Sequence, residues 1–245
     1  MRALYFKEIR SFLSSIIGYI FILIFLITSG LSHWLTPEEY GLNLLLGGEA
    51  DLIPFFNWSP WIFLFLIPAI TMRSIAEERR TGTIELLFTR PISDFKIIMA
   101  KYLASVTLLV IALLPTLTYY ITMHYIGDPV GIMDDGSAIA SYFAMLLLGA
   151  SFIAIGIFAS TLTSSQIVAF ILGAFLCSLL YAGFYILGSY NILGSYDSIF
   201  QYFGMYSHYS DMMGGAVNTK DIVYFLTIII LFIFGALTVI KSLKK

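Results

Sequence analysis

The sequence predicts an all-α integral membrane protein with six transmembrane helices, organised as a single domain over residues 1–245. Hydrophobic residues make up 59% of the chain, whereas Asp, Glu, Lys and Arg together make up only 11%. Soluble domains usually carry about 25% charged residues, so this chain has too little polar surface to coat a water-soluble globule. Two further observations support this class, namely six long apolar runs and a one-sided distribution of basic residues.

Each apolar run is long enough to cross a bilayer, because a hydrocarbon core about 30 Å thick needs about 20 helical residues. Five of the runs contain no Asp, Glu, Lys or Arg, and the third contains only Lys101, one turn from its end. A charge in the middle of a membrane costs about 2.5–3.5 kcal/mol, so runs cleared of charge are typical of spanning helices. The predicted spans are Phe12–Leu35, Phe56–Met72, Ile97–Met123, Ile139–Leu162, Ile167–Leu187 and Ile222–Ile240.

The basic residues predict the orientation, since cytoplasmic loops of membrane proteins are enriched in Lys and Arg. If the amino terminus is cytoplasmic, all of the thirteen basic residues except Lys220 lie on the cytoplasmic side. The sequence therefore predicts that both termini are cytoplasmic. The net charge of −2 predicts no nucleic-acid partner, and the single cysteine, Cys177, can form no intrachain disulfide.

Residues 1–11 predict a short amphipathic helix in the inner membrane interface, ahead of the first span. Leu4, Ile9 and Leu13 lie near one side of such a helix, and the basic residues lie largely elsewhere. The alternative is a simple cytoplasmic extension of the first span. In the third span, Pro115 lies at mid-depth and predicts a kink.

Small residues in the fourth and fifth spans predict that these two helices pack closely. Gly149 and Gly156 lie in the fourth span and Gly173 lies in the fifth, each within a series of small residues. Small residues at such spacings allow two helix backbones to approach within a membrane.

The segment 188–220, between the fifth and sixth spans, is rich in aromatic residues but is repeatedly interrupted by glycine. It is too apolar for a solvated loop and too interrupted to span the bilayer. A pair of short helices that dip into the outer interface, an extracytoplasmic re-entrant region, therefore fits best. An ordinary belt of interfacial aromatic residues is the alternative.

No catalytic motif is present. The sequence has no G-x-x-x-x-G-K-[ST] loop to hold nucleotide phosphates and no H-E-x-x-H metal motif. The histidines, His33, His124 and His208, are far apart in the sequence and predict neither a metal site nor an acid–base pair. Glu77 and Glu78 match the first two positions of the E-E-x-x-x-R pattern of intramembrane proteases. Gly82 occupies the position where that pattern requires arginine, so the pattern is not met.

The remaining feature is the loop 73–96, which concentrates charge between two apolar spans. Its centre predicts a short helix that begins near Thr83, with Thr83 as N-cap and Glu85 placed favourably against the helix dipole. Leu86 and Leu87 make this helix apolar in the cytoplasm, where the chain offers nothing to cover them. Mixed charges around an apolar contact are typical of a docking surface.

This loop reads E-E-R-R-x-G-T-I-E-L-L-x-x-x-P-I-S-x-x-x-I-x-x-x-K, and the pattern resembles the hallmark of ABC-2 type transporter permeases. The resemblance covers the whole chain, and within the family it is most similar to permease subunits associated with gliding motility. It implies an ABC-2 (type V exporter-like) fold, with an N-terminal interfacial helix, a cytoplasmic coupling helix and extracytoplasmic re-entrant helices. It also implies a location in the cytoplasmic (inner) membrane of a bacterium.

The resemblance implies a permease without catalytic activity or a cofactor of its own. Its partners would be a separate ATP-binding-cassette ATPase, a second permease subunit, identical or homologous, and membrane lipid. The residues implied in ATPase docking are Glu77, Glu78, Arg79, Arg80, Gly82, Thr83, Glu85, Leu86, Leu87 and Arg90.

Two other functions are compatible with a multi-pass chain. A non-transporting membrane scaffold that anchors a larger envelope complex would not depend on the catalytic glutamate of an ATPase. An ion-coupled secondary transporter would carry ionisable residues buried in the middle of its spans, and the sequence shows none. The sequence does not identify a substrate.

Overall fold

The computed structural model describes most of the chain: residues 1–46, 50–88, 92–190 and 197–244, with the backbone alone at 86–88 and 197–199. Every regular element within these ranges is helical. Six stretches in the described part are long and apolar enough to cross a membrane. The predicted class, an all-α fold with six transmembrane helices, is confirmed.

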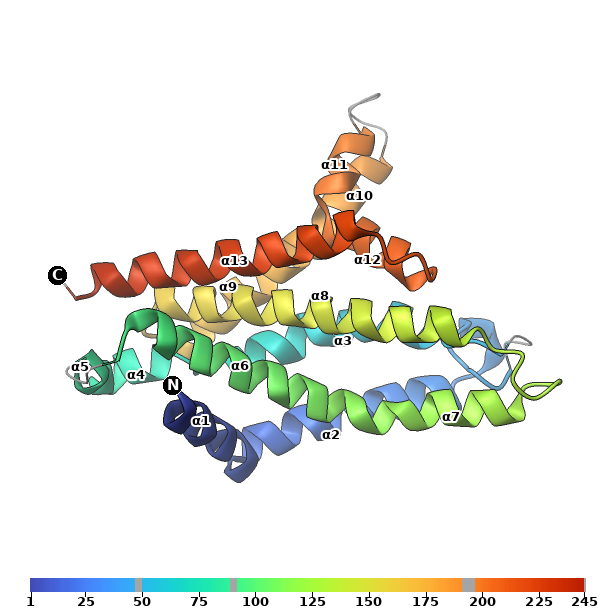
Figure 1. The fold of residues 1–245 in the computed structure, drawn as a ribbon, viewed down its shortest axis with the longest axis horizontal. Helices are drawn as coiled ribbons and strands as arrows, with labels where there is room; N and C mark the ends of the chain where they lie inside the picture. The colour runs from blue at the N-terminus through green and yellow to red at the C-terminus, as the bar shows by residue number, and fades with distance from the viewer. Residues whose placement is uncertain (47–49, 89–91, 191–196, 245) are drawn as a thin grey trace.

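Helix α1 (Arg2–Ser14) meets α2 (Ile16–Trp34), the first span, at a sharp angle (Figure 1). Ser15 between them has an extended backbone, and its Oγ accepts a hydrogen bond from the Gly18 N–H at 3.3 Å, which caps α2. A Cβ at Gly18 would lie 2.1 Å from the carbonyl oxygen of Phe12. This corner therefore requires glycine.

Helix α1 packs along α6 (Asp94–Leu113). Leu4 is buried there against Ile97 and Ala100. The helix is longer than the predicted segment 1–11, and its location in the membrane interface stays a prediction.

The second span is α3 (Ile53–Thr71), which is followed by two short helices, α4 (Ala76–Arg80) and α5 (Thr83–Phe88). The sequence predicts only one short helix in the loop 73–96, whereas the structure has both α4 and α5 there. These two helices lie at the end of the molecule where both chain termini are found (Figure 1).

The third span changes its helical geometry near the middle. Helix α6 is followed by a 3-10 turn, η2 (Leu114–Thr116), and then by α7 (Leu117–Ile126). Pro115 lies in this turn, and its ring nitrogen has no hydrogen to donate to the preceding helical turn. The structure thus places a change of helix type at the proline that predicts a kink.

Helix α8 (Asp135–Leu162) is the most buried span and lies at the centre of the bundle (Figure 1). Its N-cap is Asp134, whose Oδ1 accepts a hydrogen bond from the Gly136 N–H at 2.9 Å. It packs against α3, α6, α9 (Gln166–Ser178) and α13 (Thr219–Ser242), the sixth span.

Glycines bring α8 close to its neighbours. A Cβ at Gly156 would lie 2.1 Å from Thr71 Oγ1 of α3, and one at Gly173 of α9 would lie 3.7 Å from the Gly156 Cα. The sequence predicts that Gly149 also packs against the fifth span. In the structure, Gly149 faces Leu109 of α6 instead. The physical reason is that Gly149 and Gly156 lie about 10 Å apart along the axis of α8. Over that distance one neighbouring helix crosses away from α8 and a different helix comes into contact.

The fifth span contains a π-helical turn that the sequence does not predict. Helix α9 continues into this turn, η3 (Leu179–Gly183), and then into α10 (Phe184–Ser189). Tyr181 of the turn is fully buried, and its ring contacts Trp61 and Phe152 edge to face.

The predicted re-entrant region, 188–220, contains α11 (Asp197–Phe203) and α12 (Met205–Met213). Helices α10 and α11 lie side by side and project away from the bundle, whereas α12 packs on α8 (Figure 1). The position of these helices relative to a membrane stays a prediction.

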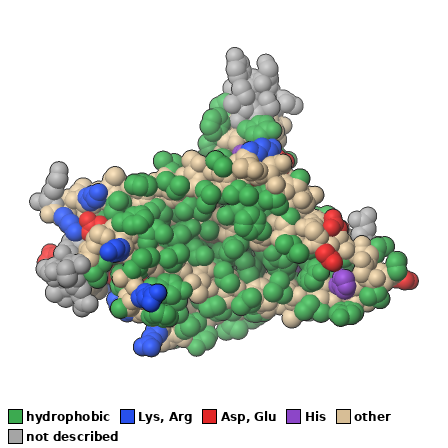
Figure 2. Space-filling view, viewed as in Figure 1, with side chains coloured by type: hydrophobic (Ala, Val, Ile, Leu, Met, Phe, Trp, Pro, Cys, Tyr) green, Lys and Arg blue, Asp and Glu red, His purple; other side chains and the backbone are tan. Residues whose placement is uncertain are grey.

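The surface carries a broad apolar region across the bundle. Figure 2 shows hydrophobic side chains over the middle of the molecule, with Lys and Arg gathered toward the end that holds α1 and α5. Acidic side chains and a histidine gather at the opposite end. On this face, basic side chains are therefore more frequent at one end and acidic ones at the other, and the orientation in a membrane stays a prediction.

Candidate functional site

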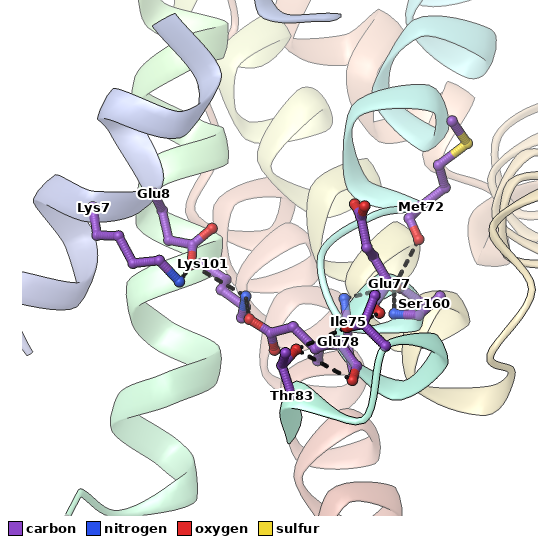
Figure 3. Close-up of polar contacts among 11 residues, drawn as sticks. Lys7, Glu8, Met72, Ile75, Glu77, Glu78, Thr83, Lys101 and Ser160 are labelled. Atoms are coloured by element: carbon purple, nitrogen blue, oxygen red, sulfur yellow. Dashed lines mark hydrogen bonds and ion pairs between the residues drawn. The ribbon is translucent and has the colours of Figure 1, made fainter. Parts of the chain in front are cut away.

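The corner between α3 and α4 is held by one buried hydroxyl group of α8. Ser160 Oγ accepts hydrogen bonds from the backbone N–H groups of Ile75 and Ala76 at 2.9 and 3.0 Å. The same hydroxyl donates to the carbonyl oxygen of Met72 at 3.0 Å (Figure 3). Because Ser160 is fully buried, no water competes for these bonds. The start of α4 is therefore fixed to the central helix of the bundle.

A buried lysine joins three helices beside this corner. The Nζ of Lys101 on α6 lies 2.7 Å from Glu78 Oε1 on α4 and 3.2 Å from Glu8 Oε1 on α1 (Figure 3). The side chain of Lys101 is only 3% exposed. A buried ammonium group is tolerated only when it is paired and hydrogen-bonded, and the two carboxylates supply that pairing. The cluster Glu8–Glu78–Lys101 therefore ties α1, α4 and α6 together.

Two of the residues predicted to dock a partner are instead engaged within the chain. Glu78 belongs to the lysine cluster, and Arg79 donates from Nη1 to the carbonyl oxygen of Thr161 on α8 at 2.5 Å. Both side chains thus make contacts within the chain, and their role as rim contacts to a partner stays a prediction. The reason is that α4 is a helix packed against the bundle, so that its side chains divide between an inner and an outer face.

The other described members of the predicted docking set lie on the surface. Arg80, Thr83 and Glu85 are exposed, and the Glu77 side chain is 39% exposed, 3.6 Å from Arg73. These side chains form one polar tip, made of the outer face of α4 and the start of α5.

Gly82 makes the turn between the two short helices. Its φ is +71°, in the left-handed region that favours glycine, and no atom of the described residues lies within 4 Å of a Cβ built on it. Backbone conformation rather than lack of space thus requires glycine here. The turn directs α5 away from the axis of α4.

The sequence predicts Thr83 as the N-cap of this helix. In the structure, Thr83 is instead the first residue of α5. Its hydroxyl group lies 2.9 Å from the Thr81 hydroxyl and donates to the Glu78 carbonyl oxygen at 3.4 Å. Gly82 precedes the helix, so the hydroxyl of Thr83 points back across the turn. Glu85 lies in the first turn of α5, where a carboxylate is favourable against the helix dipole.

Part of the predicted apolar contact cannot be placed. Arg90 lies outside the described residues, as do the side chains of Leu86 and Leu87. Ile84, from the same apolar run, is partly buried against the core of the bundle. The chain itself thus covers part of the Ile84 side chain of α5.

The sequence analysis did not identify Glu8 or Ser160 as parts of this site. Lys101 carried the only available signal, because it is the single charge in any of the six predicted spans. A basic residue in an apolar run requires a counter-charge, but its partners are 23 and 93 residues away in the sequence.

A second buried polar cluster lies at the opposite end of the molecule and shows that the histidines are not all isolated. His208 Nδ1 of α12 lies 2.6 Å from Asp221 Oδ1 of α13, and its Nε2 donates to the Tyr202 carbonyl oxygen at 3.0 Å. The imidazole also stacks on the Tyr224 ring, with centroids 3.9 Å apart. This cluster joins α11, α12 and α13, and sequence spacing alone does not predict it.

The described residues bring no three His, Cys, Asp or Glu side chains together as a group that could hold a metal ion. The polar tip offers exposed contacts, and the Ser160 hydrogen bonds and the lysine cluster behind it hold its base.

A comparison with protein families identifies a relationship for most of the chain. A family model described as "ABC-2 family transporter protein" matches residues 50–244. The matched segment contains α3 to α13, and thus five of the six candidate spans and both short helices of the polar tip. No curated protein matches the chain.

Proposed function

The chain belongs to the ABC-2 family of transporter proteins and is a multi-pass membrane protein, and from this premise we propose that it is a permease subunit driven by a separate ATPase. The polar tip on α4 and α5 would be the ATPase-docking surface. Lacking a nucleotide-binding loop of its own, the chain would depend on its partner for the free energy of ATP.

The observation that carries this proposal is the combination of an exposed tip with a firmly held base. Arg80, Thr83 and Glu85 are open to a partner, whereas Ser160 and Lys101 fix α4 to α8, α6 and α1 from behind. A surface helix that merely connected two spans would not need a buried lysine and a buried hydroxyl to hold it. The arrangement suits an element that passes displacement from a partner to the spans.

The lysine cluster supports a physical route for such coupling. A displacement of α4 moves Glu78, and Glu78 pulls on the Lys101 ammonium of α6, which also holds Glu8 of α1. An ATPase can shift the spans between two arrangements only if it contacts the tip differently in each one. ATP binding and hydrolysis would supply that difference.

The complex would contain two permeases and two ATPases, with the second permease either identical or homologous. The charge difference between the two ends of the bundle supports cytoplasmic termini, and hence a cytoplasmic tip, in the inner membrane of a bacterium. A role in gliding motility is a narrower proposal, which rests on the resemblance of the sequence. The family match does not distinguish this subtype from other ABC-2 permeases.

The docking proposal can be tested by purifying the tagged full chain from its own membranes and measuring Mg-ATP hydrolysis in the eluate. We expect Arg80→Glu combined with Glu85→Arg to lower the co-purifying activity more than tenfold. Like charges placed against each other across an interface cost on the order of several kcal/mol, which corresponds to such a loss of affinity.

The matched control is Arg10→Glu combined with Glu39→Arg, which makes the same charge changes at exposed positions away from the tip. This control should retain the activity. Undiminished ATP hydrolysis with the tip variant, or an equal loss with the control, would count against docking at α4 and α5.

A further inference from the structure

A cleft of about 190 Å³ opens between α1 and the corner of α3 and α4. Its apolar lining comes from Phe12, Ile17 and Ile70, at the ends of the helices. Its polar lining comes from Ser11, Ser15 and Ser74 and from the charged residues Lys7, Glu8, Arg73, Glu77, Glu78 and Lys101. The cleft lies at the start of the first candidate span and near the end of the second. One part of its lining is therefore apolar, and the other part is polar. Such a gradient is found at the boundary between the hydrocarbon core and the headgroups.

The charges that line the cleft are of both signs. Lys101 is paired with both Glu8 and Glu78 at hydrogen-bonding distances. In contrast, Lys7 lies 3.8 Å from Glu8, and Arg73 Nε lies 3.6 Å from Glu77 Oε2. These two distances are longer than good hydrogen bonds, so both cations can still bind a ligand.

Arg73 has the donor geometry that a phosphate group requires. Among the described residues, both of its polar contacts, with Gln166 and Glu77, use Nε. The two terminal nitrogens of the guanidinium group are thus left to donate in parallel, which is the arrangement that recognises phosphate. Lys7, on the opposite wall, supplies a second cation.

We propose that this cleft binds the headgroup of an aminophospholipid, with its phosphate between Arg73 and Lys7 and its ammonium group at Glu77. The lining has equal numbers of basic and acidic side chains, which favours a zwitterionic headgroup over an anionic one. A primary ammonium group donates hydrogen bonds to a carboxylate, whereas a quaternary one has no hydrogen to donate.

The size and position of the cleft point to a lipid as the source of this group. Its volume of about 190 Å³ is below the about 300 Å³ that pockets for drug-sized molecules start from, which suits a group as small as ethanolamine phosphate. Phe12, Ile17 and Ile70 supply an apolar wall for the beginning of an acyl chain. Basic pockets between membrane helices on the cytoplasmic side are known to hold lipid headgroups. The proposal does not depend on an ATPase, because none of its contacts involves a partner.

The test uses the full chain in detergent micelles that contain equal amounts of phosphatidylethanolamine, phosphatidylcholine and phosphatidylglycerol. Native mass spectrometry counts the lipids that each protein molecule retains. We expect one phosphatidylethanolamine to be retained in preference to both other lipids. Removing either cation, by Arg73→Ala or Lys7→Ala, should lower its occupancy about fivefold, the effect expected of one basic residue near a membrane surface.

Arg80→Ala is the matched control, since Arg80 is exposed on α4 but does not line the cleft, and it should retain the lipid. Equal retention of all three lipids, preference for phosphatidylglycerol, or unchanged binding after Arg73→Ala would overturn the proposal. In a separate experiment, soluble ethanolamine phosphate is added to distinguish binding of a membrane lipid from binding of the free headgroup. If it displaces the lipid at equal concentration, the headgroup alone is recognised and a lipid-specific site is excluded.

Discussion

Lys101 Nζ lies 2.7 Å from Glu78 Oε1, so that the third span is joined by a buried ion pair to the short helix that follows the second span. The third member of the cluster, Glu8, belongs to the N-terminal helix. The same stretch of sequence thus supplies both an exposed tip and its internal anchor.

Replacing Lys101 by Met should destabilise the protein by about 3 kcal/mol, because removing one member of a buried pair leaves charges uncompensated. Glu8 and Glu78 would then face each other without the buried ammonium group between them. The change can be followed as a lower midpoint of thermal unfolding in a fixed detergent. The variant that also carries Glu8→Gln and Glu78→Gln should recover most of the loss. A triple variant as unstable as Lys101→Met would show that lost packing, and not uncompensated charge, is the cause.

Replacing Ser160 by Ala should loosen the corner between α3 and α4 at a cost of about 1–3 kcal/mol, since two buried N–H groups lose their acceptor. We expect faster cleavage by trypsin after Arg80 in the folded protein. Ser151→Ala is the control, because Ser151 is buried on the same helix and its hydroxyl donates to the Leu147 carbonyl oxygen of that same helix. Equal cleavage rates in the two variants would contradict the anchoring role of Ser160.

Replacing Gly156 by Ala should separate α8 from α3 and destabilise the bundle by about 1–3 kcal/mol, the usual cost of overpacking. The added Cβ would lie 2.1 Å from Thr71 Oγ1, far inside van der Waals contact. Gly30→Ala is the comparison, since among the described residues the nearest atom to its Cβ would be the Tyr119 hydroxyl oxygen, at an ordinary contact distance of 3.5 Å. Thermal unfolding of both variants should show a lower midpoint for Gly156→Ala alone. Combination with Thr71→Ala should restore part of the stability.

The predicted orientation can be tested by cysteine labelling in intact cells. A cysteine at Asn218 should react with a membrane-impermeant maleimide, and one at Ser242 should react only after the membrane is opened. Both positions are exposed, and the native Cys177 is buried. Labelling of Ser242→Cys, and not Asn218→Cys, in intact cells would reverse the orientation.

The sequence analysis located the spans well because the requirement for a span is local. About 20 consecutive apolar residues suffice for a prediction, and α8, for instance, extends only a few residues beyond the predicted Ile139–Leu162. The π-helical turn at Leu179–Gly183 was missed, since nothing in an apolar run distinguishes it from an α-helical turn. Gly149 was assigned to the wrong neighbour because residue size indicates that a helix is approached closely, but not by which helix.

The sequence by itself determined the membrane class, the number of spans, the separation of charge between the two ends and the motif that places the chain in its family. Only the tertiary structure decided which charges of α4 face outward and which face the bundle. It also brought Glu8 to Lys101 and Asp221 to His208. The physical reason is that hydropathy acts along a continuous segment, whereas the partners of a buried polar side chain are set by how separate helices cross.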